Sequence, residues 1–139
     1  MKWICLIAGA LVMASSAMCS QATESAACPV PSGAVKVALP SGLPPALRDA
    51  MGDVALPGEQ FDTTDVYIKG HKHRCYIFVW NIGSRWIVAT ENGGIALRAE
   101  VSTYKFVKDG KTAALLKQRF TFPENACSLA TKLSKNSKR

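Results

Sequence analysis

The stretch RCYIFVWNIGSRWIVATENGG, Arg74 to Gly94, decides how this chain folds. Its first seven residues are rich in β-branched and aromatic side chains, which strands favour. A short loop at 81–84 that contains a glycine separates them from a second run of the same kind, Arg85 to Thr90. We therefore predict a β-hairpin in the middle of a sheet.

The first strand of this hairpin, Arg74 to Trp80, is apolar on both faces. Strict alternation would place Cys75, Ile77 and Val79 on one face and Tyr76, Phe78 and Trp80 on the other. A strand that is apolar on both faces is covered on both. We expect a helix on one side, and the N-terminal arm, sheet curvature or a partner on the other.

Turn residues separate this hairpin from three further strand candidates, at 65–69, 95–107 and 112–122. Apolar and polar residues alternate in 95–107, which predicts one dry face and one solvated face; the solvated face would carry Arg98, Glu100 and Ser102.

Two short segments have helical character. In PPALRDAM, residues 44–51, a proline suits the first helical turn and the glycine that follows suits the end. Residues 126–133 predict one or two further helical turns. The predicted fold class is α+β, with one short N-terminal helix packed on an antiparallel meander of about five strands.

The N-terminus has the pattern of an export signal: a basic start, an apolar run at 4–14 and then small residues. The run is about half of the ~20 residues that a membrane-spanning helix needs. No second run of this kind follows, so we expect an exported protein, periplasmic or secreted, without a transmembrane span in the mature chain.

The sequence allows three interpretations of how the N-terminus is processed. The small-x-small pattern occurs at 20–22 and at 15–17, and it predicts a cut before Thr23 or before Met18. Lipid attachment at Cys19 is the third, but serine and methionine stand where lipoproteins usually have leucine and a small residue. With a cut before Thr23, we predict a signal peptide at 1–22, an extended arm at 23–43, an α+β domain at 44–130 and a basic tail at 131–139.

A cut before Thr23 leaves three cysteines, Cys28, Cys75 and Cys127. One disulfide is expected in an oxidising compartment, and an odd cysteine is left over. We predict a Cys28–Cys127 disulfide, because it would tie the two coil-rich ends together. Cys75 would then be a small buried residue in a strand, although the spacing leaves a Cys75–Cys127 disulfide open.

Charge divides the chain unevenly. Residues 23–65 carry a net charge of −4 and residues 66–139 a net charge of +10. A basic domain outside the cytoplasm favours an acidic protein or an anionic envelope component as partner. We expect no nucleic acid partner, because no recognition motif is present.

Catalytic and metal-binding patterns are weak. His71 and His73 would share a face of an extended strand, as in some zinc and copper sites, but the neighbouring cations oppose a divalent ion. Cys75 as a nucleophile would have only His73 as a base. We therefore expect no cofactor and no enzymatic activity.

The leading hypothesis is a small, exported, non-enzymatic binding protein of the inhibitor or immunity type. Its candidate binding residues are Trp80, Arg85, Trp86, Arg98, Tyr104, Lys108 and Lys111. One alternative is a module that binds an anionic small molecule, lipid or envelope polymer, with Trp86, Tyr104 and Arg98 lining an enclosed pocket. The second alternative is a small hydrolase that uses His71 or His73 with a loop carboxylate.

Overall fold

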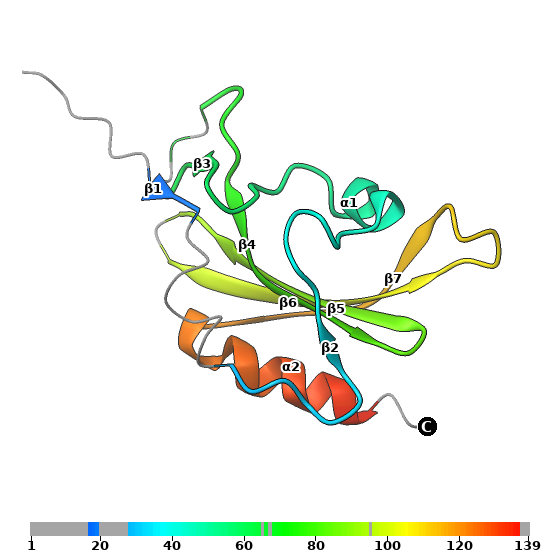
Figure 1. Ribbon diagram of the computed structural model, residues 1–139. Helices are drawn as coiled ribbons and strands as arrows, with labels where there is room; N and C mark the ends of the chain where they lie inside the picture. The colour runs from blue at the N-terminus through cyan, green and yellow to red at the C-terminus, as the bar shows by residue number, and fades with distance from the viewer. Residues whose placement is uncertain (1–16, 20–27, 65, 67, 95, 137–139) are drawn as a thin grey trace, which may run out of the picture.

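The structure is a computed structural model that describes residues 17–19, 28–64, 66, 68–94 and 96–136. Its centre is an antiparallel sheet of five strands in the order β2-β4-β5-β6-β7 (Figure 1). The strands are β2 Val35–Lys36, β4 Arg74–Ile82, β5 Arg85–Asn92, β6 Arg98–Phe106 and β7 Ala113–Thr121. The predicted central hairpin is confirmed as β4 and β5.

Two helices and a small second sheet complete the fold. Helix α1, Pro45–Met51, lies on one face of the five-stranded sheet, and α2, Ala126–Lys135, lies on the other (Figure 1). A 3-10 turn at Pro123–Asn125 leads into α2. Strand β1, Ala17–Met18, pairs with β3, Gln60–Phe61. The α+β class is confirmed, but a single N-terminal helix is wrong, because the longer helix is C-terminal.

The fifth strand of the sheet is not the predicted one. Within 65–69, Asp65 and Tyr67 lie outside the described residues, and Val66 and Ile68 are exposed and belong to no strand. The outer edge of β4 is already occupied, because the Val37 amide donates to the Val79 carbonyl and the Ala55 amide to the Arg74 carbonyl. The arm therefore supplies the fifth strand, as β2.

A β-bulge at Ile77 changes which side chains of β4 share a face. The register of β4 against β5 shifts between Tyr76 and Phe78. Phe78 and Trp80 therefore face α2, and Tyr76 and Val79 face α1. The strict alternation that we predicted is wrong at this point, because a bulge inserts one unpaired residue and reverses the faces beyond it.

Strand β6 is also buried on both faces from Ala99 to Tyr104, so the predicted solvated face is wrong for Glu100 and Ser102, while Arg98 is exposed as predicted. Ala99 and Val101 pack under α2. On the other face, Glu100 and Ser102 are buried, and the Ser102 hydroxyl lies 2.9 Å from the Glu100 carboxylate. Arg74 approaches the same carboxylate at 3.9 Å. These contacts allow a carboxylate to be buried beside the sheet.

Helix α2 closes the second face of the sheet. Its buried residues Ala126, Ala130 and Leu133 follow helical spacing and pack on the cluster around Phe78 and Trp80. The predicted disulfide between Cys28 and Cys127 is confirmed, and it ties the arm to the first turn of this helix. Residues 131–135, which we predicted to be part of a basic tail, are helical.

Two aromatic substitutions can test which side chains of this fold are buried in the core. Trp80 is 1% exposed beneath α2, whereas Phe122 is 63% exposed. We expect Trp80→Ala to lower the free energy of unfolding by about 3–5 kcal/mol, and Phe122→Ala to change it by less than about 0.5 kcal/mol. Urea denaturation followed by circular dichroism measures both. Similar losses in the two variants would contradict this arrangement of the core.

Candidate functional site

Strand β7 presents an unusual number of apolar side chains to solvent. Leu115 and Leu116 are each 49% exposed, Phe120 is 54% exposed, and Phe122 follows directly after the strand. Only Ala113, at the start of β7, is buried. We call these four apolar residues, together with the exposed cations Lys117 and Arg119, the β7 surface. Clustered exposed apolar side chains mark binding sites more often than scattered ones.

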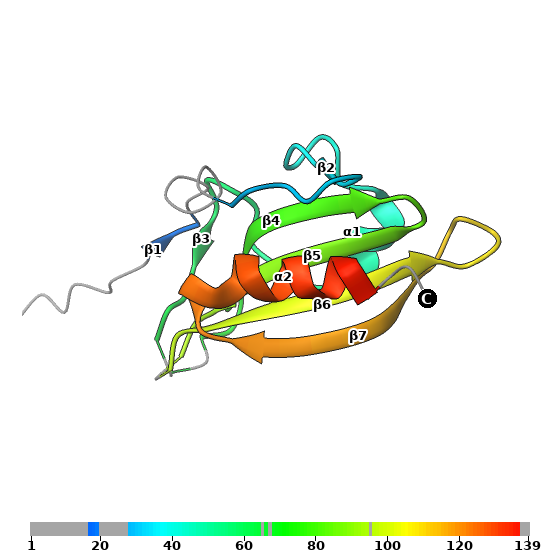
Figure 2. The ribbon, with the colours of Figure 1, turned by 90° about the horizontal axis from the view of Figure 1, so that it is seen from below.

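The positions of the two helices explain why β7 is uncovered. Helix α2 runs over β5 and β6, and β7 extends beside it without a helix above (Figure 2). On the other face, the core beneath α1 reaches β7 only at Ala113, which packs with Leu47 and Tyr104. Helix α1 therefore packs against the start of β7, whereas residues 114–120 of the strand are left exposed.

The outer edge of β7 is open as well. Strand β4, at the other side of the long antiparallel ladder, is covered by β2, by Val37 and by Ala55. No segment within the described parts of the chain pairs with β7 on the side away from β6. A nine-residue strand with an open edge presents a row of amides and carbonyls that can pair with another strand.

The two faces of β7 differ in chemistry. Arg119 is paired with Val101 and Lys117 with Thr103, so both cations lie on the face that carries α2. Phe120 is paired with Glu100, and Leu115 with Tyr104, so these apolar residues lie on the opposite face. The register of β6 against β7 shifts between Thr103 and Tyr104, which leaves Leu116 without a paired residue on β6. The shift divides the paired residues of β7 into 113–115 and 117–121.

Positive charge extends from β7 into its surroundings. The Arg98 guanidinium lies 5.6 Å from the centre of the Phe120 ring, a cation–π contact. The hairpin that enters β7 carries Lys108 and Lys111, both exposed. Its one carboxylate, Asp109, accepts a hydrogen bond from the Lys111 amide at 2.9 Å and so belongs to the turn. These exposed cations would attract an acidic ligand toward the start of β7 and toward Phe120, while exposed Glu124 lies in the turn beyond the other end of the strand.

The structure buries some of the predicted binding residues and exposes others. Trp80 and Tyr104 are buried in the two cores, so they do not form a surface. Trp86 is half-buried, with its ring edge-on to Phe106 at 5.8 Å. Of the predicted cations, Arg85 is half-buried opposite Lys105, while Arg98, Lys108 and Lys111 are exposed near β7.

Sequence reasoning missed the apolar half of the β7 surface. We predicted residues 112–122 as a strand but named none of Leu116, Phe120 and Phe122 as a candidate binding residue. The signal that could have indicated otherwise is position in the chain, because this is the last strand of a meander and therefore an edge.

The two histidines lie apart from β7. His71 is exposed and lines a depression of about 400 Å³ with Glu59, Gln60, Gly70 and Lys72. The Glu59 carboxylate accepts a 2.7 Å hydrogen bond from Lys72, which, with the Leu56 amide, lowers the pKa of Glu59. The depression is thus lined by an ion pair, in which Lys72 balances the charge of the Glu59 carboxylate.

His73 is half-buried near Asp62. The pKa of Asp62 is lowered, chiefly because its carboxylate accepts hydrogen bonds from the Thr64 hydroxyl and amide, and to a smaller extent by the charges of His73 and His71. Cys75 cannot serve as a nucleophile or metal ligand here, since its sulfur is bonded to Cys19. No group of three potential metal ligands gathers among the described residues.

A buried polar cluster lies under α1, around Glu100, Ser102 and Arg74. Burial raises the pKa of Tyr76 to about 12. Burial, and then the charge of Glu100, raises the pKa of Tyr104. The Arg74 guanidinium also donates a hydrogen bond to the carbonyl of Met51 and so ties the end of α1 to the sheet. The contacts of this cluster therefore help to hold α1 on the sheet.

Comparisons with protein-family models, with curated proteins and with solved structures found no match. Within the described ranges, no helix has the length and apolar character needed to cross a membrane.

The burial of Tyr76 makes the stability of the fold depend on pH in the alkaline range. Its folded-state pKa of about 12 exceeds the ordinary 10.0, so the stability from its neutral form is present below pH 10 and is lost as the pH rises toward 12. Tyr76→Phe should remove this part of the alkaline loss. At neutral pH it should cost little, because the Tyr76 hydroxyl has no hydrogen-bond partner among the described residues.

Urea denaturation of both proteins at about pH 8 and about pH 11 measures this difference. We expect the variant to lose less unfolding free energy than the parent between the two pH values. An equal alkaline loss in both proteins would show that Tyr76 ionises as readily in the folded as in the unfolded chain.

Proposed function

We propose that this chain is an exported, non-enzymatic binding protein that takes up an acidic, extended segment of a partner protein along β7. The observation that carries this proposal is the coincidence of three features on one strand. These features are an open edge, an exposed apolar row and an exposed cationic row on the opposite face. Extended peptides that add to a sheet edge use main-chain hydrogen bonds for affinity and alternate side chains for specificity.

The alternation of β7 specifies what the added strand should look like. Side chains of neighbouring antiparallel strands pair on the same face. A partner strand would place apolar residues beside Leu115 and Phe120 and carboxylates beside Lys117 and Arg119. An alternating apolar and acidic segment satisfies both faces, and the surrounding cations would steer it toward the edge.

A second copy of this chain fits the edge less well. Antiparallel pairing of β7 with β7 about its middle would place Lys117 opposite Lys117 and bring the two Arg119 side chains onto the same face. Like charges that are directly opposite destabilise a strand pair. An anionic membrane surface would match the cations and exposed phenylalanines, but it offers no backbone groups to the open edge.

Export agrees with the disulfide content. The structure contains two disulfides, Cys19–Cys75 and Cys28–Cys127, and such bonds persist in oxidising compartments. Together with the basic, apolar and small-residue order of the N-terminus, they support a periplasmic or secreted protein. The non-enzymatic assignment rests on the lack of a catalytic motif in the sequence and on the engagement of Cys75 in a disulfide.

The direct test is binding of a synthetic, fluorophore-labelled peptide of about ten residues that alternates valine with glutamate, a usual strand length. We expect saturable binding in fluorescence anisotropy that weakens as salt is raised, because exposed charges are screened. A peptide that alternates valine with lysine should not bind.

Charge reversal makes the test specific to β7. Lys117→Glu/Arg119→Glu should weaken binding of the glutamate peptide roughly tenfold and create binding of the lysine peptide. The matched control, Lys132→Glu/Lys135→Glu on the exposed face of α2, makes the same change in net charge and should leave both results unaltered. Phe120→Ser should weaken binding of the glutamate peptide, but the variant should still bind this peptide more tightly than the lysine peptide.

Three outcomes would overturn the proposal. One is equal loss of binding in the β7 and α2 charge variants, which would indicate only general attraction to a basic protein. The second is binding to vesicles of anionic lipid but not to the glutamate peptide. The third is self-association of the free protein in sedimentation that Phe120→Ser abolishes.

A further inference from the structure

We propose that the precursor is processed by hydrolysis of the peptide bond between Ala17 and Met18, so that the mature chain begins at Met18. In this step water adds across the bond, leaving a carboxylate on Ala17 and an amino group on Met18. The inference shares with the proposed function only the expectation of export, and it is independent of what β7 binds.

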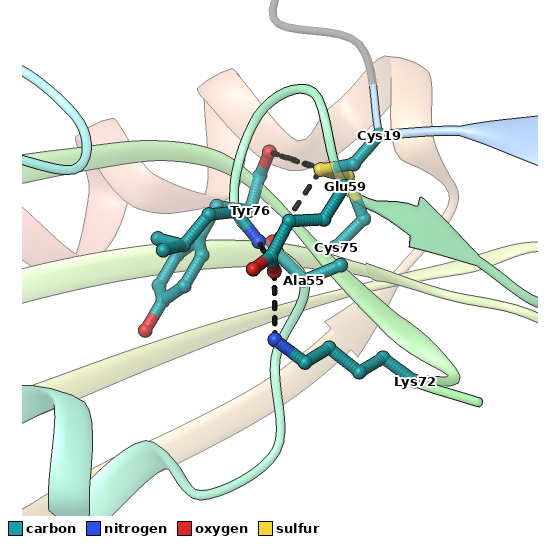
Figure 3. Close-up of a disulfide and its surroundings, with 7 residues drawn as sticks. Cys19, Ala55, Glu59, Lys72, Cys75 and Tyr76 are labelled. Carbon is teal, nitrogen blue, oxygen red and sulfur yellow. Dashed lines mark hydrogen bonds and ion pairs between the residues drawn. A yellow bond between two sulfur atoms is a disulfide. The ribbon is translucent and has the colours of Figure 1, made fainter. Parts of the chain in front are cut away.

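Cys19 is an integral part of the folded domain. Its sulfur is bonded to Cys75 in β4 (Figure 3). The residue is 2% exposed in a small core with Ala55 and Phe61. Its backbone is also fully engaged, because its amide donates to the Glu59 carbonyl at 2.8 Å and its carbonyl accepts from the Gly58 amide at 2.9 Å. Main chain and side chain both hold Cys19 against the domain.

Hydrogen bonds between neighbouring residues shape the site that holds Cys19. The Glu59 carboxylate accepts hydrogen bonds from the Leu56 amide and from Lys72, each at 2.7 Å, and these close the loop that carries Gly58 (Figure 3). The Ala55 carbonyl accepts from the Tyr76 amide at 3.1 Å, which fixes the same loop to β4. The loop is thus held in place for a residue that a cut before Thr23 would remove.

The cut before Thr23 conflicts with this arrangement. It would discard Cys19, leave Cys75 as a buried unpaired thiol and open a hole between Ala55 and Phe61. The loss of buried atoms without collapse of the site destabilises a protein. The other disulfide, Cys28–Cys127, would remain, so the mature chain would carry an odd cysteine in an oxidising compartment.

Lipid attachment at Cys19 conflicts with it as well. A lipoprotein carries its diacylglycerol through a thioether on the cysteine sulfur. That sulfur has no valence left when it is bonded to Cys75. The disulfide and the thioether therefore exclude each other.

The cut before Met18 keeps every contact of Cys19. Residues 15–17 read Ser-Ser-Ala and satisfy the small-x-small pattern. Met18 is exposed and retains its pairing with Gln60. Cys5 leaves with the signal, so the mature chain has four cysteines, all of them paired in the structure. The odd cysteine disappears.

The experiment is the intact mass of the complete chain, expressed with its own N-terminus and a C-terminal tag in a bacterial host and recovered from the exported fraction. We expect a mass that begins at Met18, no thiol that reacts with iodoacetamide before reduction, and four that react after it. A chain that begins at Thr23 with one reactive thiol would overturn the proposal, as would lipid mass on Cys19 or an uncleaved chain.

Two matched substitutions identify the cut independently of folding. Ala17→Arg places a large cation immediately before the proposed cut and should cause the precursor to accumulate. Ala22→Arg does the same at the alternative site; it should be cleaved normally, and its mature mass should increase by the Ala-to-Arg difference. Accumulation of precursor with Ala22→Arg and normal processing of Ala17→Arg would contradict a cut before Met18.

Peptide mapping without reduction provides a second readout. A digest should contain the N-terminal peptide with Cys19 linked to the peptide with Cys75. A binding failure of the β7 surface would leave these masses unchanged, so the two proposals can fail separately.

Discussion

The two-sided burial of β4 is the constraint on which the rest of the structure depends. Its bulge at Ile77 places Phe78 and Trp80 under α2 while Tyr76 and Val79 remain under α1. A strand buried on both faces requires a cover on each side, and among the described residues α1 and α2 supply these covers. Helix α2 lies over β5 and β6, and α1 packs on Ala113 at the start of β7, so residues 114–120 of β7 remain exposed in the described part of the chain.

Both disulfides serve the same central strand. Cys19–Cys75 attaches the N-terminal segment directly to β4, and Cys28–Cys127 fixes α2, which covers Phe78 and Trp80. Closing long loops in this way constrains the unfolded chain, and for a small domain each bond contributes a few kcal/mol. The N-terminal segment and α2 are therefore held covalently, whereas α1 is held by packing and by the hydrogen bond from Arg74 to Met51. Strand β7 pairs with β6 and packs against α1 at its start.

The sequence predicted the parts of the fold that depend on local pattern. The central hairpin, the short helix at 45–51 and the class were accessible, because β-branched density and the positions of proline and glycine are local signals. The Cys28–Cys127 disulfide joins distant residues, and it was predicted because it would tie the two coil-rich ends together. The bulge at Ile77, the burial of Glu100 and the role of Cys19 were not. Each depends on a contact between distant segments, and the apolar row of β7 looks the same in an edge strand as in a central one.

Strand β7 is the long edge strand of the sheet, and we propose that it receives an acidic strand at its open edge. Amide hydrogen exchange with mass spectrometry, with and without the valine–glutamate peptide, tests it directly. In the free protein, β7 should exchange faster than β5, and the peptide should slow exchange in β7 alone. Protection that appears at the His71 depression or along α2, with β7 unchanged, would contradict the account.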